Sequence, residues 1–185
     1  MQPRSRPEEQ EVSLEPARPA DAVLLQRWRG EPSVRRFQPL GSASTARLGA
    51  EIADQNISDL YRGRGEKYQW IIRVGDQPAG WVTLVVANWD HGLAELGYAL
   101  STPFQGRRLM PRVLELLLSD LFQGTRLERI EARCAVDNVA SQRVLERVGF
   151  TREGRLRGYF VLGRHRVDNW LYAILKQDWL ERQTG

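Results

Sequence analysis

The feature that most constrains the fold is a change of pattern around Pro103. Residues 93–100, LAELGYAL, are typical of a strand, whereas residues 110–122 repeat apolar side chains at helical spacing. A glycine-containing loop, FQGRR, joins the two segments. A helix that starts in such a loop leaves its first backbone N–H groups free, beside the positive end of its dipole. This segment therefore predicts a binding site for an anion.

Around this segment, extended and helical stretches alternate along the chain. The expected strands are 12–17, a meander of 68–74, 79–89 and 93–100 with its first turn at Asp76-Gln77, a half-buried strand at 129–136, and a closing pair at 151–162 and 166–175. The other expected helices are one capped by Asp21, a short turn at 33–37, one at 45–60, and one between an Asn138 cap and Gly149.

The composition indicates one compact domain. A chain of 185 residues, 42% hydrophobic and 27% charged, is ordinary for a soluble globular protein. We expect a flexible tail at 1–10 and a single domain at 11–183, located in the cytoplasm, since neither a membrane span nor a secretory signal is evident.

The single Cys134 falls on the inner face of its strand, which predicts a buried free thiol. With this one cysteine and two histidines we expect no metal. The net charge is +4, but the basic residues are scattered among acidic ones, which argues against nucleic acid.

A second segment, DNVASQRVLERVGF at 137–150, joins a strand to a short helix that ends in Gly-Phe. An asparagine cap and a glycine stop account for it without any ligand. Together with the loop at 104–110, however, it makes the sequence resemble the GNAT acyltransferase superfamily, in particular its RimJ/RimL-like N-acetyltransferase branch. The resemblance covers nearly the whole chain after residue 10 and includes LLQRWRGEPSVRRF, ELGYAL, FQGRRLM, IEARCAVDNVASQRVLERVGF and REGRLRGYFVLGRHRVDNWLYAIL.

The resemblance implies an α/β (α+β) GNAT fold. Its mixed, mostly antiparallel sheet has six to seven strands, is splayed at its centre between 93–100 and 129–136, and carries helices on both faces. Acetyl-CoA, as cosubstrate, would insert its pantetheine arm at the splay, with Asn138 contacting the arm and Ser141 near the sulfur. The resemblance places the pyrophosphate on the loop and helix start formed by Gln105, Gly106, Arg107, Arg108, Leu109 and Met110.

Arg108 stands where the family loop has its second glycine. Glycine there permits a positive φ or a close approach of phosphate to the backbone. Because the position opens a helix, we expect a negative φ, which an arginine tolerates, and its guanidinium could then reach a CoA phosphate. A positive φ, or a side chain that points inward, would instead block the cradle.

Acetyl transfer to an amine needs a neutral nitrogen, a donor for the oxyanion and a proton for the thiolate. The resemblance implies that the oxyanion donor is the backbone N–H of Tyr98, Ala99 or Leu100, with Glu95 as the base and Ser141 as the acid. For each there is a plainer alternative, a surface glutamate and a helix-start serine. Two family groups are missing: a tyrosine four residues after Ser141 is Leu145, and a glutamate before Tyr159 is Gly158.

The acceptor would be a primary amine, either a protein N-terminus or a small molecule. Trp28 and Phe37 are the expected acceptor-side residues, with Tyr159 and Asp168 opposite them on the closing strand pair. The resemblance also allows a homodimer. Because of Arg108, Leu145 and Gly158, one alternative stays open: a catalytically impaired GNAT-shaped module that binds CoA or a protein partner.

Overall fold

The computed structural model describes residues 11–184, so the expected tail at 1–10 lies outside the described residues. The strands are β1 (Val12–Pro16), β2 (Lys67–Val74), β3 (Gln77–Asn88), β4 (Leu93–Leu100), β5 (Arg129–Ala135), β6 (Thr151–Leu162) and β7 (His165–Leu175). The helices are α1 (Ala22–Arg29), α2 (Pro32–Arg35), α3 (Thr45–Ala53), α4 (Ile57–Tyr61), α5 (Leu109–Gly124), α6 (Val139–Val148) and α7 (Lys176–Thr184). Two 3-10 turns, Pro19–Asp21 and Thr102–Phe104, complete the described chain.

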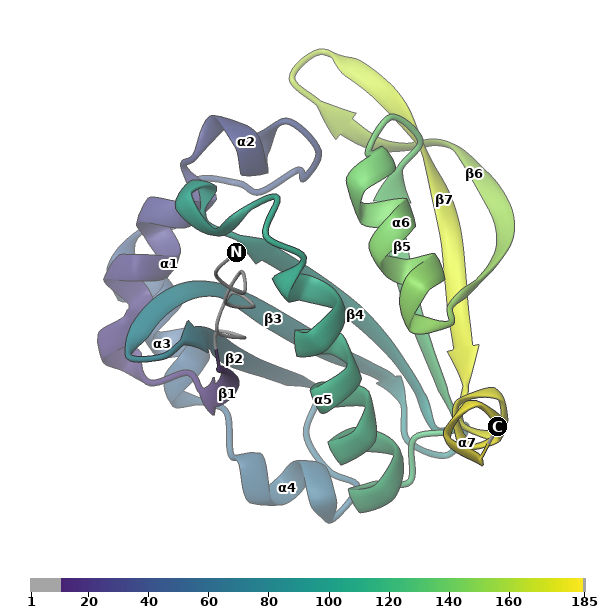
Figure 1. Cartoon of the computed structure of the whole chain (residues 1–185). Coiled ribbons are helices and arrows are strands. Elements are labelled where there is room, and N and C mark those ends of the chain that lie inside the picture. Colours follow the sequence, from purple (N-terminus) through teal and green to yellow (C-terminus); the bar gives the residue numbers. More distant parts are fainter. Residues whose placement is uncertain (1–10, 185) are drawn as a thin grey trace, which may run out of the picture.

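The strands form one seven-stranded sheet in the order β1-β2-β3-β4-β5-β7-β6 (Figure 1). Neighbouring strands are antiparallel except β4 and β5, which run parallel because α5 crosses over between them. This mixed, mostly antiparallel sheet confirms the expected architecture.

The sheet splits between β4 and β5. Residues 93–96 pair with residues 129–132, and beyond that point the two strands part. On its other side β4 stays paired with β3 along its whole length. Gly80 allows this close approach, because a Cβ there would lie 2.2 Å from the Ala99 carbonyl oxygen.

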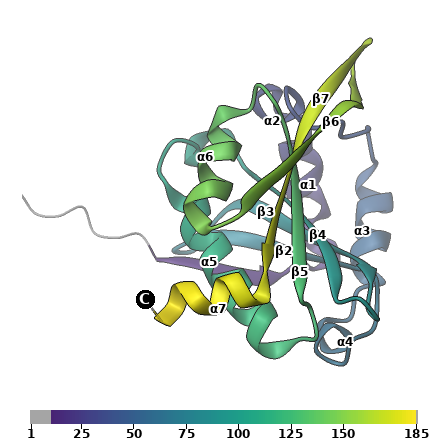
Figure 2. The same cartoon turned by 90° about the vertical axis from the view of Figure 1, so that its right-hand side faces the viewer.

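Helices cover both faces of the sheet (Figure 2). On one face, α5 buries the side chains that predicted it, including Val113, Leu117 and Leu121, in the larger core. On the other face, α1 and α3 enclose a smaller core in which the Trp28 and Trp81 rings stack with centroids 6.3 Å apart. The face of the β5–β7–β6 layer away from α6 carries no such helix among the described elements (Figure 2).

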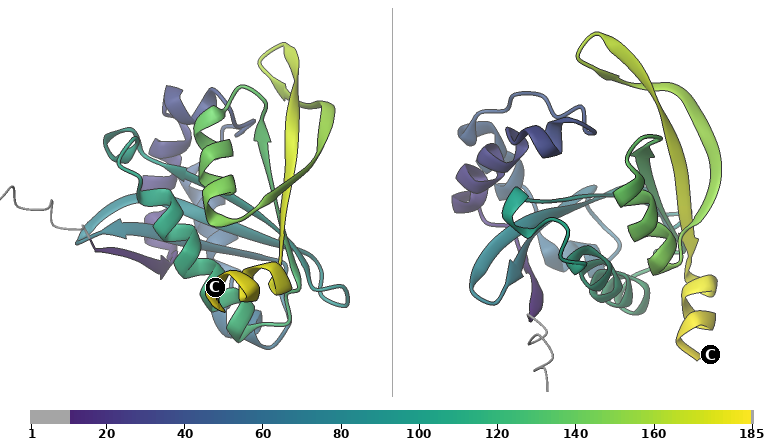
Figure 3. Two further views of the ribbon diagram at one scale, coloured as in Figure 1. Left: turned by 45° about the vertical axis from the view of Figure 1, so that its right-hand side comes forward. Right: turned by 45° about the horizontal axis from the view of Figure 1, so that its top comes forward.

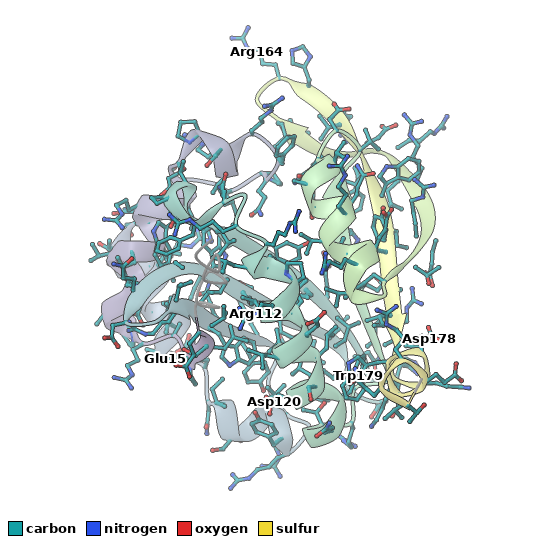
Figure 4. The ribbon with its side chains drawn as sticks, viewed as in Figure 1. Glu15, Arg112, Asp120, Arg164, Asp178 and Trp179 are labelled. Atoms are coloured by element: carbon teal, nitrogen blue, oxygen red, sulfur yellow. The ribbon has the colours of Figure 1, made fainter. Side chains whose placement is uncertain are left out.

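The β6–β7 hairpin extends past the end of α6, and α2 lies across from it (Figure 3). Arg164 marks the tip of the hairpin (Figure 4). At the other end of the layer, α7 follows β7 and packs Trp179 against Phe122 of α5, with ring centroids 5.8 Å apart. The helix α7 was not expected from the sequence.

Three local predictions are wrong. The helix expected at 45–60 is divided into α3 and α4, because Asn56 accepts a bond from the Ser58 N–H and so caps a new helix. The first hairpin turn is Gly75-Asp76, where Gly75 supplies a positive φ, and Gln77 already belongs to β3. Asp21 does not cap α1 with its side chain, since its carboxylate accepts from the Arg18 N–H at 2.8 Å.

Candidate active site

A cavity of about 940 Å³ occupies the place where β4 and β5 part. Its walls come from α2 and the loop after it, the open ends of β4 and β5, the loop before α5, the first turn of α5, one side of α6 along its length, and Phe160 of β6. Arg108, Arg133, Arg143 and Arg147 line it, and of the described lining residues only Glu95 carries a carboxylate. The cavity is therefore suited to a negatively charged ligand.

The helix α5 begins at this cavity without a side-chain cap. Arg108 holds the N-cap position but makes no capping bond, so the backbone N–H groups of Leu109 and Met110 at the helix start have no cap. Pro111 has no N–H to satisfy, which suits its place in the first turn. Free N–H groups at the positive end of a 16-residue helix provide the geometry on which the predicted anion site depends.

Arg108 has φ 57° and ψ 26°, the left-handed conformation, and is the one non-glycine residue with positive φ in the described chain. The expectation of a negative φ is therefore wrong: the loop keeps the backbone shape of a glycine motif, at a cost of about 1 kcal/mol for a residue with a Cβ. The expected consequence of a positive φ, a blocked cradle, does not follow, because Arg108 is exposed and the cavity beside it is open. Gly106 also has positive φ, at 74°.

The open edge of β4 is held by side-chain amides. Gln38 Nε2 donates to the Tyr98 carbonyl at 2.8 Å, and Gln105 Nε2 donates to the Leu100 carbonyl at 2.8 Å. Because the N–H and C=O of a strand residue point to the same side, the Tyr98 and Leu100 N–H groups also face the gap. Ala99 alternates with them and faces β3, which argues against the prediction that its N–H serves as oxyanion donor.

Glu95 lies on the cavity wall, and its carboxylate is ion-paired with Arg133 of β5. Arg133 also contacts Glu131 and lies over the Tyr159 ring, 5.2 Å from its centroid. The Glu95–Arg133 ion pair lies where the hydrogen-bonded pairing of β4 with β5 ends. The Glu95 side chain keeps 38% of its surface exposed. A carboxylate held there is accessible to a ligand in the gap.

Ser141 and Asn138 also line the cavity, at the start of α6. The Asn138 side chain caps the helix by accepting from the Ser141 N–H at 3.2 Å. The Ser141 hydroxyl lies 2.9 Å from the Tyr98 hydroxyl, and it is close enough to the Cys134 thiol to influence the pKa of that thiol. Burial raises the pKa of Cys134 to about 11, so the predicted buried free thiol is neutral near pH 7.

The four expected acceptor residues are not brought together. Phe37 lines the cavity, but Trp28 is fully buried beneath the sheet and does not reach it in this structure. Tyr159, 41% exposed, and Asp168 lie on the hairpin, outside the lining. Asp168 instead accepts bonds from the Gly158 N–H and from Arg155, both at 2.7 Å. Arg107 also lies off the lining, with its guanidinium over the Phe104 ring.

Residues 11–151 match the acetyltransferase (GNAT) domain family. The chain belongs to the GNAT acetyltransferase family. This GNAT protein is 25% identical over 158 residues to the uncharacterized N-acetyltransferase p20 of Bacillus licheniformis, covering 85% of the chain and 88% of that protein. It is 36% identical over 80 residues to the ribosomal-protein-serine acetyltransferase of Escherichia coli, covering 43% of the chain and 45% of that protein. The predicted kinship with ribosomal-protein acetyltransferases is thus confirmed.

Solved structures confirm the GNAT fold. Spermidine N-acetyltransferase from Vibrio cholerae in complex with CoA and spermine superposes with a TM-score of 0.79 at 20% identity, over 91% of this chain and 98% of that one. RimL, a ribosomal L7/L12 α-N-protein acetyltransferase in complex with CoA, superposes with a TM-score of 0.78 at 22% identity, over 91% and 96% of the two chains. The chain is therefore an acetyltransferase by family, and it has the GNAT fold.

Three residues of this GNAT site escaped the sequence reasoning in their present roles: Gln38, Arg133 and the hydroxyl of Tyr98. Gln38 lies in a loop without pattern, so no local signal pointed to it. Arg133 shares the outward face of its strand with Glu131, and that alternation was visible in the sequence. The pairing of Arg133 with Glu95, 38 positions earlier, was not visible in the sequence, because it forms only in the fold.

Proposed function

We propose that this protein transfers the acetyl group of acetyl-CoA to a primary amine by direct attack of the amine nitrogen on the thioester. The observation that carries the proposal is the uncapped start of α5, which opens into a cavity between parted strands. An extended arm with a diphosphate at one end fits this shape, because its phosphates meet free N–H groups and its amides meet the open edge of β4.

For the cofactor, the proposal uses residues already on the cavity wall. The pyrophosphate lies over the backbone of residues 105–110, and Asn138 contacts the pantetheine arm. Arg108, Arg143 and Arg147 add positive charge to the cavity wall. A guanidinium beside a phosphate forms a charge-assisted hydrogen bond, which is stronger than a neutral one.

For the chemistry, the proposal assigns one group to each requirement. The N–H of Tyr98 or Leu100 faces the gap and can donate to the oxyanion of the tetrahedral intermediate. Glu95 accepts the proton of the ammonium group, directly or through one water, while Arg133 holds its carboxylate in place. Ser141 faces the leaving sulfur.

The acceptor end of the proposed site is the wall that contains Phe37 and Glu95. Among the similar proteins, one is named for spermidine and others for ribosomal proteins, so both kinds of amine belong in the test. The cavity charge favours an acceptor with a single amine over a polyamine, because a polycation would meet several arginines and one carboxylate that is already paired.

Thiol release from acetyl-CoA tests this function with a panel of peptides that have free N-termini, single small amines and spermidine. We expect release that depends on the acceptor, with peptides or single amines ahead of spermidine, and a rise in melting temperature with acetyl-CoA alone. Glu95→Gln should lower kcat at least about tenfold without loss of that thermal shift. No thermal shift would contradict acetyl-CoA binding, whereas a shift without turnover would support the alternative of an impaired binding module.

A further inference from the structure

The two halves of the split sheet are joined across the cavity by a pair of hydroxyl groups. Tyr98 belongs to the open end of β4 and Ser141 to the first turn of α6, and their hydroxyl oxygens are 2.9 Å apart. These elements lie on opposite sides of the split (Figure 1). Both residues line the cavity, at the place proposed for the thioester.

The Tyr98 phenol is kept protonated by its surroundings. Burial raises its pKa well above the ordinary value for tyrosine, an effect that the Ser141 bond only partly offsets. The titratable neighbours are the Cys134 thiol and the Tyr172 phenol, and Tyr172 donates its own proton to Glu146 at 2.9 Å. Tyr98 therefore keeps a proton that it can donate to Ser141 at any pH near neutrality.

Ser141 is fixed at two points. Its N–H is held by Asn138, and its Oγ lies 2.9 Å from the Tyr98 hydroxyl. A serine hydroxyl has one proton and two lone pairs. If Tyr98 donates to one of these lone pairs, the serine proton remains available for a sulfur atom in the cavity.

We propose that Tyr98 is a positioning residue for Ser141. In this chain the Tyr98–Ser141 pair assists the leaving group in place of the family tyrosine, whose position is occupied by Leu145. Leu145 is fully buried and carries no hydroxyl, so it cannot assist the leaving group. Tyr98 instead reaches the same serine from β4 and directs the serine proton into the cavity. This inference rests on the proposed acetyl transfer and names the group that makes its leaving-group step work.

The step balances as follows. A bond forms between the amine nitrogen and the acetyl carbon, and the carbon–sulfur bond breaks with its electron pair on sulfur. Ser141 donates a hydrogen bond to this thiolate, which strengthens as the charge develops. The amine attacks in its neutral form, after the ammonium group has passed one proton to Glu95 and on to solvent. A second proton leaves the nitrogen as the new bond forms and takes the same route, and solvent returns one proton to the thiolate, so Tyr98 and Ser141 end unchanged.

A double-mutant cycle of Tyr98→Phe and Ser141→Ala tests this in the full chain. Because Tyr98 acts through Ser141, Tyr98→Phe should lower kcat about 5- to 20-fold, with the KM for acetyl-CoA changed by less than about twofold. In the Ser141→Ala background the same change should have no further effect on kcat. Tyr172→Phe, which removes another buried hydroxyl that does not contact Ser141, is the matched control and should retain kcat. Thermal melting confirms that each variant is folded.

A second readout needs no turnover. Bound CoA has a free thiol, and its ionisation can be followed by thiolate absorbance as pH rises, as the difference between samples with and without CoA. Ser141 should lower the pKa of the bound thiol, and Tyr98→Phe should raise it to the value found for Ser141→Ala.

Losses of kcat that multiply in the double variant would overturn the positioning role, as would a Tyr98→Phe enzyme altered only in KM. If the wild-type protein binds CoA without turnover, the thiol titration alone tests the positioning role of Tyr98. A wild-type protein that fails to bind CoA would overturn the proposed function together with this inference. An active wild type with an unchanged Tyr98→Phe variant would overturn the inference only.

Discussion

The strand β4 is held in two different ways along its length. Residues 93–96 have strand partners on both sides, whereas residues 97–100 have β3 on one side and the cavity on the other. At the open end, Gln38 and Gln105 supply the donors that β5 supplies at the closed end. Gln38 and Gln105 both belong to loops outside the sheet. Their side-chain amides can therefore move away from β4 without breaking any strand pairing.

This difference shows how the site is made. A backbone ladder is cooperative and persists with the fold, while a single side-chain bond contributes only about 1 kcal/mol. A ligand amide can therefore replace Gln38 or Gln105 at the open end at little cost. The closed end, with its buried side chains, keeps the two half-sheets in register while this exchange occurs.

The closed end should be the more costly to disturb. Ile130 of β5 pairs with Ala94 and is fully buried, so Ile130→Ala should lower the free energy of unfolding by about 3 kcal/mol through lost burial and the cavity it leaves. Urea unfolding measures the change. Val85→Ala, at an exposed position of β3, is the control and should cost less than about 1 kcal/mol. Equal losses for the two variants would remove the distinction between the closed end and the surface.

The rim of the open end carries a smaller, opposite effect at Arg108. Arg108→Gly should raise the free energy of unfolding by about 1 kcal/mol, because glycine adopts the left-handed conformation without strain. Arg108→Ala loses the same charge but keeps a Cβ at positive φ, so it should give no such gain.

Acetyl-CoA titration separates charge from strain in the same pair. If the guanidinium binds a phosphate, both variants should bind acetyl-CoA several-fold more weakly and with less dependence on salt. Tighter binding by both would instead mean that the arginine obstructs the loop.

Residue patterns predicted the framework well, because strand alternation and the apolar face of α5 are local properties. They erred where one polar residue decides between two outcomes. Asn56 ends a predicted long helix by capping a new one, and Arg108 accepts a conformation that its position at a helix start did not suggest.

The site was predictable only where it rests on a contiguous segment. The loop before α5 and the Asn138–Ser141 turn stand out in the sequence, and both line the cavity. The contacts that cross the split do not stand out, because Tyr98 and Ser141 are 43 positions apart and meet only through the fold. Trp28 shows the converse, since its place on the first helix suggested an acceptor-side role and the structure puts it in the core instead.

Exchange of Gln38 can be tested with a matched pair of glutamines. Gln38→Ala and Gln26→Ala each remove one side-chain bond to a backbone carbonyl, Tyr98 in the first case and Ala43 in the second. Each should lower the free energy of unfolding by no more than about 1 kcal/mol. Only Gln38→Ala should alter acetyl-CoA affinity, with up to about fivefold tighter binding, because the ligand no longer has to displace an amide. Unchanged affinity in both variants would mean that Gln38 stays in place when the ligand binds.

The last prediction concerns the thiol of Cys134, which lies on β5 two residues after Ala132, the last residue paired with β4. Its pKa of about 11 follows from burial, so the thiol is almost entirely protonated at pH 7.5 and should react with iodoacetamide far more slowly than a free small thiol. The rate should rise about tenfold per pH unit toward pH 11, within the range where the protein remains folded.

Since the raised pKa favours the neutral thiol in the folded state, its contribution to stability is complete below about pH 8.5 and is lost as pH rises through about 11. Cys134 is the single cysteine of the chain, so Cys134→Ala gives the zero of labelling, and bound acetyl-CoA should slow the reaction further by filling the cavity. Labelling at pH 7.5 as fast as that of the free thiol, with the same rate when acetyl-CoA is present, would place the sulfur outside the gap. The open end would then begin beyond Cys134, closer to Asn138.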